Sequence, residues 1–321
     1  MTAPTLRSFE ASDVAAAGDL LALRHARHRA AEPLLAARYA EPDAARAEVQ
    51  ALVDGGATGA VAEQEGRLVG YLIGGPKAAA VWGPNAWVDA AGHAVEEAET
   101  ARDLYAAAAT TWHAEGRTAH YALVPAHDTA LVDAWFRLGF GLQHVHGVRE
   151  VPDTPAAAPA QLVVRRAVRG DIPTMAQLDL ELPLHQGRSP VFSAGHLPSL
   201  EEAIAEWEDD FDDADFTHFV AEHDGRVIGS AIGCALEKSS LHPPLTRPDR
   251  AGFLGFAAVL PEARGLGAGR ALGDAVLAWT AGAGFTSAAT DWRATNLLAS
   301  RTWPRLGFRP TFLRLHRHLG Y

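Results

Sequence analysis

The sequence predicts an α/β (α+β) protein made of two tandem domains, each a mixed β-sheet flanked by helices. The chain has 321 residues, enough for two domains of about 100–200 residues. Its halves share two segments: "VAEQEGRLVG" (61–70) matches "VAEHDGRVIG" (220–229), and "WFRLGF" (135–140) matches "WPRLGF" (303–308). Segments that recur once, in the same order, indicate a duplicated domain rather than a repeat array.

The stretch between the two halves is rich in proline and alanine. "VPDTPAAAPAQ" (151–161) contains three prolines, which interrupt both helical and strand periodicity and are typical of a linker. We therefore expect a first domain over residues 1–150, a linker over 151–161 and a second domain over 162–321.

Strands and helices alternate along each predicted domain, as in a sheet covered by helices. The Glu/Asp-Gly-Arg triplet of the first repeat predicts the turn of a β-hairpin in each half. In the second domain, Asp171 and Ser199 stand where N-caps begin two helices. The remaining elements predicted there are strands near 161–168, 217–222, 226–234, 252–260, 286–292 and 311–319, and helices near 268–281 and 296–306.

Composition and charge exclude several classes of function. The formal net charge of −11 argues against a general binder of nucleic acid or anionic membranes, because phosphate neutralisation needs clustered Lys and Arg. The single cysteine, Cys234, excludes a disulfide framework, and no spacing of residues resembles a metal site. No apolar run reaches the roughly 18 residues of a membrane span. The N-terminal residues lack the apolar core of a signal peptide, so we expect a cytoplasmic protein.

A glycine-rich turn is the segment that best indicates chemistry. It lies between a predicted strand and a predicted helix and consists of Arg264, Gly265, Leu266, Gly267, Ala268, Gly269 and Arg270. It lacks the Gly-Lys-Ser/Thr end of a Walker loop, and Arg270 stands where a dinucleotide fingerprint needs its third glycine. Two interpretations remain. The turn caps the following helix, or its N–H groups and arginines hold a pyrophosphate at the helix N-terminus.

The context of this turn resembles motif A of the GNAT acyltransferase superfamily. "VLPEARGLGAGRAL" (259–272) contains the Gln/Arg-x-x-Gly-x-Gly/Ala pattern at Arg264, Gly267 and Gly269, and "TDWRATNLLASRTWPRLGF" (290–308) resembles the next block of that family. The resemblance implies two tandem GNAT-like domains. Each would have a mixed sheet splayed between its fourth and fifth strands, and in the second domain acyl-CoA would lie there.

The resemblance also implies a function. It implies an N-acetyltransferase that moves an acetyl (acyl) group from acetyl-CoA, its co-substrate, to the amine of a small molecule, without a metal. Backbone N–H groups of Ala257 and Val259 would bind the acyl carbonyl and the pantetheine, the turn would bind the pyrophosphate, and Asn296 would bind the pantetheine arm. The protein would be a monomer, as a pseudo-dimer, or a homodimer. The alternative is a non-catalytic acyl-CoA-binding sensor or scaffold protein.

Two catalytic positions depart from the family pattern. Trp303 stands where many members carry a tyrosine, and an indole N–H does not ionise in the range a general acid needs. The sulfur would then leave as a thiolate, or draw a proton from water or from Ser300. Phe253 occupies the glutamate position of some histone-type members. Asp291 aligns instead with a glutamate of ribosomal-protein-type members and is the candidate base.

The acceptor side of the site is less defined by the sequence. The resemblance places His185 and His242 in segments where members build acceptor pockets, so either is a candidate contact for the acceptor. Asp291 also has a structural alternative, as a strand-end carboxylate that accepts a hydrogen bond from a loop N–H.

The first domain lacks the glycine turn. The offset of 168 residues between the "RLGF" repeats aligns Glu96, Glu97, Ala98 and Glu99 with Arg264–Gly267, and Asp128 with Asn296. Carboxylates at this turn would repel a phosphate in a low dielectric. We therefore expect no CoA site in residues 1–150, whose role would be structural or to form a wall of the acceptor site.

Overall fold

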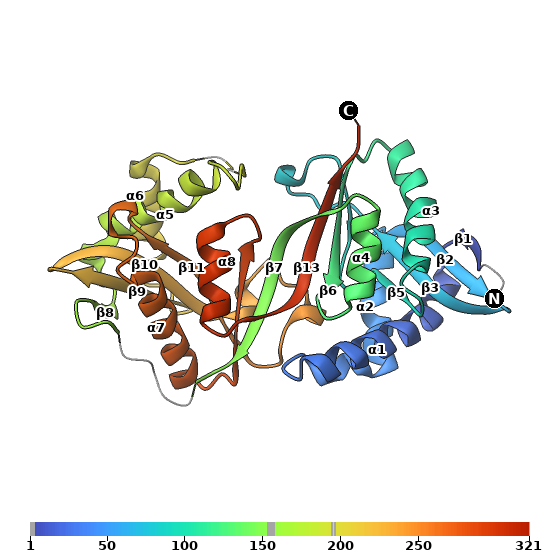
Figure 1. Ribbon diagram of the computed structural model, residues 1–321, viewed down its shortest axis with the longest axis horizontal. Helices are drawn as coiled ribbons and strands as arrows, with labels where there is room; N and C mark the ends of the chain where they lie inside the picture. Colours follow the sequence, from blue (N-terminus) through green and yellow to red (C-terminus); the bar gives the residue numbers. More distant parts are fainter. Residues whose placement is uncertain (1–3, 153–157, 194, 196, 321) are drawn as a thin grey trace. The chain divides into compact units, whose positions relative to one another are not determined.

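The computed structural model describes residues 4–152, 158–193, 195 and 197–320. The centre of the predicted linker, 153–157, lies outside them. The chain packs into two compact units, whose residues can be followed by the sequence colours of Figure 1: unit 1 is Met1–Val145, Pro243–Asp249 and Pro310–Tyr321, and unit 2 is His146–His242 and Arg250–Arg309. The predicted α/β (α+β) class is confirmed. The packing units and the predicted sequence domains differ mainly at the C-terminal strand, which packs in unit 1.

Unit 1 contains two sheets. The first has the strand order β1 (Thr5–Ser8), β2 (Thr58–Gln64), β3 (Arg67–Gly74) and β5 (His93–Val95), with antiparallel neighbours. In the second, β4 (Asn85–Val88) pairs parallel with β6 (Ala119–Pro125), and β6 pairs antiparallel with β13 (Arg309–His318). The helices of this unit are α1 (Val14–Ala31), α2 (Pro42–Asp54), α3 (Thr100–Ala114) and α4 (Thr129–Arg137).

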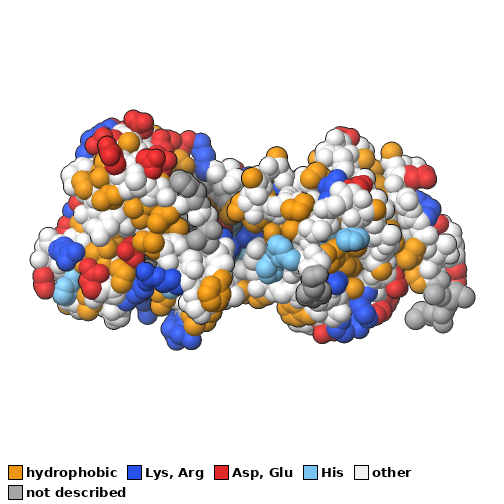
Figure 2. All heavy atoms as spheres, turned by 90° about the horizontal axis from the view of Figure 1, so that it is seen from above, with side chains coloured by type: hydrophobic (Ala, Val, Ile, Leu, Met, Phe, Trp, Pro, Cys, Tyr) orange, Lys and Arg blue, Asp and Glu red, His pale blue; other side chains and the backbone are white. Residues whose placement is uncertain are grey.

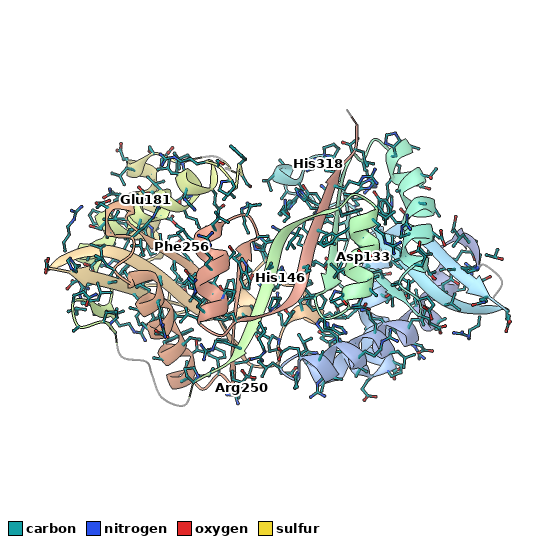
Figure 3. The ribbon with its side chains drawn as sticks, in the orientation of Figure 1. Asp133, His146, Glu181, Arg250, Phe256 and His318 are labelled. Atoms are coloured by element: carbon teal, nitrogen blue, oxygen red, sulfur yellow. The ribbon has the colours of Figure 1, made fainter. Side chains whose placement is uncertain are left out.

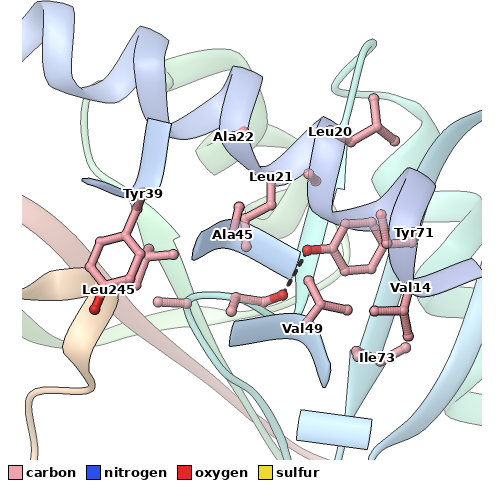
Figure 4. Close-up of a cluster of buried hydrophobic side chains, with 14 of the residues drawn as sticks. Val14, Leu20, Leu21, Ala22, Tyr39, Ala45, Val49, Tyr71, Ile73 and Leu245 are labelled. Atoms are coloured by element: carbon pink, nitrogen blue, oxygen red, sulfur yellow. Dashed lines mark hydrogen bonds between the residues drawn. The ribbon is translucent and has the colours of Figure 1, made fainter. Parts of the chain in front are cut away.

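The core of unit 1 forms where α1 and α2 meet the first sheet. Figure 4 shows Leu21, Val49, Tyr71 and Ile73 in this cluster, and all four are fully buried. The hydroxyl of Tyr71 donates to the carbonyl oxygen of Ala91 at 2.7 Å, the dashed line of Figure 4. The buried phenol thus satisfies its one polar atom, as a tyrosine in a core requires.

Unit 2 contains one sheet with the strand order β8 (Val163–Arg166), β9 (Phe216–His223), β10 (Arg226–Ala235), β11 (Ala251–Val259) and β12 (Ser287–Arg293). The first four strands are antiparallel neighbours, and β11 pairs parallel with β12. Next to β12 lies β7 (Gly141–Glu150), which enters unit 2 at His146. The helices are α5 (Ile172–Gln186), α6 (Leu200–Asp210), α7 (Ala268–Gly282) and α8 (Leu297–Arg305).

Local sequence signals account for several of these elements. The predicted hairpins are confirmed as β2–β3 and β9–β10, and in each the turn places a carboxylate residue and a glycine at positive φ, Glu65-Gly66 and Asp224-Gly225. Ser199 caps α6 in a capping box with Glu202, as predicted. Short 3-10 helices complete the chain: η1 (Ala11–Asp13), η2 (Ala37–Ala40), η3 (Ala80–Trp82), η4 (Arg169–Asp171), η5 (Leu236–Lys238), η6 (Pro244–Thr246) and η7 (Pro261–Ala263).

Both units repeat one arrangement of charges at the start of their first helix. An arginine of the first strand joins a buried aspartate before that helix to a glutamate of the neighbouring strand. The trios are Arg7, Asp13 and Glu63 in unit 1, and Arg165, Asp171 and Glu222 in unit 2. Hydrogen bonds from each guanidinium lower the pKa of Asp13 and of Asp171. This equivalence in space supports the duplication predicted from the sequence.

Among the helices of the described chain, none combines the length and the apolar character needed to span a bilayer.

Candidate active site

The strands β11 and β12 pair over only part of their length. The described register joins Ala251–Leu254 to Ser287–Thr290 and stops there, where the hydroxyl of Thr290 donates to the carbonyl of Leu254 at 2.9 Å. Beyond this point β11 keeps β10 as its partner through Val259. The register with β10 skips Gly255, so this residue forms a β-bulge, and bulges bend a strand and end its pairing. Strand β11 therefore leaves β12 at Gly255.

The backbone donors of β11 beyond the bulge alternate between its two sides. The N–H of Leu260 donates to Ile228 of β10 at 2.9 Å. Because N–H groups alternate along a strand, the N–H of Ala258 also points to β10, and those of Ala257 and Val259 point to the side from which β12 has diverged. This is the orientation that the predicted binding of an acyl carbonyl and pantetheine requires.

The glycine turn follows directly on β11. Gly265 and Gly267 have φ values of 93° and 87°, and Gly267 is the N-cap of α7. A Cβ at Gly265 would meet nothing within 4 Å, and one at Gly269 would come no closer than 3.8 Å to Val259. Packing of the chain therefore does not require glycine at position 269, although glycine destabilises a helix by about 0.5–1 kcal/mol. A Cβ at Gly267 would lie 3.5 Å from the Cγ of Pro159, so the space at Gly265 and Gly269 is the part of the turn that fits a group approaching the backbone closely, as a pyrophosphate would.

The first and last residues of the turn are exposed arginines, Arg264 and Arg270. The Nε of Arg270 lies 3.7 Å from the carboxylate of Asp274, one helical turn further along α7. Burial raises the pKa of Asp274. The helix N-terminus and both guanidinium groups thus give this end of α7 a positive potential suited to an anion.

The structure places Asn296 as the N-cap of α8. Its Oδ1 accepts hydrogen bonds from the N–H groups of Leu298 and Ala299 at 3.2 and 3.3 Å. The Nε2 of His185, from the end of α5, lies 3.2 Å from the same oxygen. Asn296 therefore has a structural role at the helix start, and its binding of pantetheine remains a prediction that would use its amide N–H₂.

Asp291 lies one residue beyond the last paired residue of β12, with 16% of its side chain exposed. Its Oδ2 is 3.7 Å from the Nδ1 of His242, whose side chain is only 2% exposed. The imidazole of His146, from β7 (Figure 3), packs against that of His242 with ring centres 4.2 Å apart. His146 was not predicted from the sequence, because no local signal connects β7 with β12.

The two remaining predicted positions lie on α8. Ser300 is half-buried in the first turns of the helix, where its N–H donates to the carbonyl of Asn296 at 2.9 Å. Trp303 is buried, and its ring lies 3.4 Å from the position that a Cβ of Gly273 in α7 would occupy. The indole at the usual tyrosine position therefore packs in the core between two helices.

The segment of unit 1 aligned with the glycine turn carries carboxylates that are paired with arginines. Glu99 is the N-cap of α3, as Gly267 is of α7. Glu99 forms ion pairs with Arg102 and Arg137 at 2.6 and 2.8 Å, and Glu96 pairs with Arg67. Over the described part of the chain, no group of three His, Cys, Asp or Glu side chains is placed to hold a metal ion.

Comparisons with known proteins agree with this geometry. Residues 182–308 match the profile of the acetyltransferase (GNAT) family, so the chain carries a GNAT acetyltransferase domain. A solved GCN5-related N-acetyltransferase from Sphaerobacter thermophilus is similar over 99% of this chain and 97% of that one, with 15% identity and a TM-score of 0.57. A tandem GNAT protein from the clavulanic acid biosynthesis pathway is similar over 99% of both chains, with 19% identity and a TM-score of 0.49. No curated protein sequence matches. Over nearly its whole length the chain therefore has the fold of a GNAT protein.

Proposed function

We propose that the protein transfers the acetyl group of acetyl-CoA to the amine of a small molecule, at one active site in unit 2. The observation that carries this proposal is the divergence of β11 from β12 directly before the glycine turn. It leaves the N–H groups of Ala257 and Val259 beside a strand edge that ends at a positive helix N-terminus. An acyl thioester joined to a pyrophosphate has both features that such an edge recognises, a carbonyl and an anion.

Acetyl-CoA would lie along this edge as the acyl donor. The N–H of Ala257 or Val259 would donate to the thioester carbonyl, on which negative charge develops as the amine attacks. A donor fixed at that position lowers the barrier because it needs no reorganisation during the reaction. The turn from Arg264 to Arg270 would hold the pyrophosphate.

Asp291 would take a proton from the acceptor ammonium. The nitrogen lone pair then forms the C–N bond, the C–S bond breaks, and the nitrogen releases its second proton to solvent. The sulfur leaves as a thiolate that takes a proton from water, or from Ser300, which water then reprotonates. The carboxylate suits this role because it stands one residue past the point of divergence and is partly exposed.

The surface of α5 and α6 supports a cationic acceptor. Asp and Glu side chains gather over these helices in Figure 2, and α5 and α6 contribute Asp179, Glu181, Glu201, Glu202, Glu206, Glu208, Asp209 and Asp210. Burial, together with the nearby Glu206, raises the pKa of Asp179. A surface of one sign attracts ligands of the other sign and raises their local concentration, which favours amines that are protonated in solution.

The proposal is tested by two measurements on the same protein. Acetyl-CoA at 100 times its dissociation constant should stabilise the chain by about 2.7 kcal/mol, and a panel of small amines should include one that accelerates the release of free CoA. Asp291→Asn should lower kcat by about 10²–10⁴-fold for an alkylamine, because a general base supplies a factor of that size, and should leave the affinity for acetyl-CoA unchanged. Stabilisation without thiol release for any amine would instead identify an acyl-CoA-binding sensor or scaffold.

A further inference from the structure

We infer that His242 is a positioning residue for Asp291, so that the proton-accepting group of the site is held by a buried histidine. This inference rests on the proposed acetyl transfer. Three segments far apart in the sequence meet at this point: β12 with Asp291, residues 239–242 after η5, and β7 with His146.

The division of roles follows from exposure. Asp291 is partly exposed at the divergence of β11 from β12, whereas His242 is only 2% exposed. An acceptor in solution can therefore reach the carboxylate and not the imidazole. His242 would act on the reaction through Asp291, whose Oδ2 lies 3.7 Å from its Nδ1.

The imidazole of His242 is held in place from several sides. Its Nδ1 lies 2.8 Å from the hydroxyl of Ser239, and that hydroxyl also accepts a hydrogen bond from the N–H of Leu241 at 3.3 Å. The ring of Phe253, in the paired part of β11, packs edge-on with ring centres 5.2 Å apart. His146 packs against it with ring centres 4.2 Å apart. These contacts fix the ring so that its Nδ1 edge, hydrogen-bonded to Ser239, lies 3.7 Å from the carboxylate of Asp291.

A fixed dipole beside the carboxylate would orient it for the acceptor. The proton passes from the acceptor ammonium to Asp291, the nitrogen forms its bond to the acetyl carbon and releases its second proton to solvent, the C–S bond breaks and CoA leaves as the thiolate, and His242 gains and loses no atom. Such orientation matters most when a proton must be removed before attack, because an amine that is already neutral carries a free lone pair and needs no base before it attacks. The contribution of His242 should therefore depend on the basicity of the acceptor.

Two substitutions distinguish the Nδ1 edge from the rest of the ring. In His242→Asn the amide lies near the position of Nδ1, and in His242→Gln it lies near that of Nε2. For an alkylamine, which is protonated at pH 7, we expect His242→Gln to lower kcat at least tenfold and His242→Asn to retain most of the activity. For an aromatic amine, which is neutral at pH 7, both should stay within about threefold of the wild type, with KM for acetyl-CoA unchanged.

His120 provides a matched control in unit 1. It is 1% exposed, and its Nδ1 lies 2.8 Å from the hydroxyl of Tyr105. His120→Gln should lower the free energy of unfolding by about as much as His242→Gln does. Its effect on kcat, if any, should be the same for the alkylamine and the aromatic amine. Equal losses for the two amines in His242→Gln, or no advantage of Asn over Gln, would overturn the inference.

A second measurement does not depend on turnover. In protein labelled with ¹⁵N-histidine, Asp291→Asn should shift the Nδ1 resonance of His242, which is assigned by its loss in His242→Gln. An unchanged resonance would overturn the contact even if the protein acetylates amines. Failure of every amine to release CoA, with the resonance shift present, would remove the proposed function and leave the pairing of His242 with Asp291 in place.

Discussion

The strand that precedes the helix N-terminus is continuous in unit 2 and broken in unit 1. In unit 2, β11 pairs parallel with β12 through Leu254 and then continues beside β10. In unit 1 the parallel and the antiparallel pairing are made by two separate strands: β4 pairs parallel with β6, and β5 pairs antiparallel with β3. In each unit, the chain before the helix therefore leaves its parallel neighbour strand at the same place in the fold. A duplicated GNAT domain predicts this agreement.

The two units differ in what occupies that place. In unit 1, Arg24 of α1 donates to the carbonyls of Ala90 and His93, between β4 and β5, and the Nε2 of His93 lies 2.9 Å from the carbonyl of Leu123 in β6. Burial lowers the pKa of Arg24 to about 10 and that of His93 to about 3. In unit 2, Gly255–Ala257 and Val259 are exposed or half-buried. The fold keeps the divergence in both units, and the side chains around it determine whether a ligand has room. We propose a structural role for unit 1 on this basis.

The largest expected effect tests the filling of unit 1. Arg24→Ala removes a buried side chain and leaves two buried carbonyls without their donor, so we expect it to lower the free energy of unfolding by about 3–5 kcal/mol. Urea denaturation measures this loss. The control is Arg27→Ala, about one helical turn further along α1 at an exposed position. It should change the free energy of unfolding by less than about 0.5 kcal/mol. Equal costs for the two substitutions would contradict the role assigned to Arg24.

The next effect converts the turn of unit 2 toward that of unit 1. Gly267→Glu introduces the residue that stands at the equivalent N-cap, Glu99, and we expect acetyl-CoA affinity to fall at least 100-fold, about 2.7 kcal/mol. Gly267→Asn controls for the φ of 87° at this position, since asparagine tolerates the left-handed region. Calorimetric titration should give one site per chain in the wild type and none in Gly267→Glu. Residual binding at full affinity would place a site elsewhere, including unit 1.

A third comparison uses the shared trio of charges. The arginine lowers the pKa of Asp13 and of Asp171. A lowered pKa in the folded state means that the stabilisation is complete above the ordinary aspartate range near pH 4 and is lost as the pH falls further. We expect Asp13→Asn and Asp171→Asn each to cost about 1–2 kcal/mol at pH 7 and progressively less as the pH falls below 4. Asp19→Asn, in an exposed pair with Arg46, should cost less at either pH, and a cost independent of pH would contradict the assignment.

The smallest effect separates stability from binding. Gly269→Ala should raise the free energy of unfolding by about 0.5–1 kcal/mol, because alanine is the better helix former. It should also lower the affinity for acetyl-CoA, because it places a methyl group over the turn. Gly282→Ala, at the other end of α7 with nothing within 4 Å of the added Cβ, should stabilise without affecting affinity. Thermal melts and titration measure both quantities. Unchanged affinity in Gly269→Ala would show that the ligand does not approach this backbone closely.

Elements whose sequence signal lies in adjacent residues could be predicted from the sequence alone. The two hairpin turns, the Ser199 cap and the helix after the glycine turn follow from residues adjacent in the chain, and all are confirmed. The position of β13 was not predictable in this way, because the residues of a strand do not specify which strand it will pair with, and the partner of β13 is β6 in the first half of the sequence.

In the candidate site, too, features within one segment could be predicted and contacts between distant segments could not. The turn and its arginines form one continuous segment, so their arrangement could be inferred from spacing, although their binding of CoA stays a prediction. The pairing of His242 with Asp291, and the packing of His146 behind them, join three segments that only the completed sheet of unit 2 brings together. Sequence patterns report periodicity along a chain and do not report such contacts.

The place of β13 has a consequence for how the chain matures on the ribosome. Unit 1 is nearly all made by Val145, yet the strand that pairs with β6 begins only at Arg309. At roughly 5–20 residues per second, β6 waits some ten to thirty seconds for its partner, with one edge of its sheet unpaired. The nascent first half is thus exposed to mispairing until β13 has been made, and a chain that stops before Arg309 lacks a strand of its first unit.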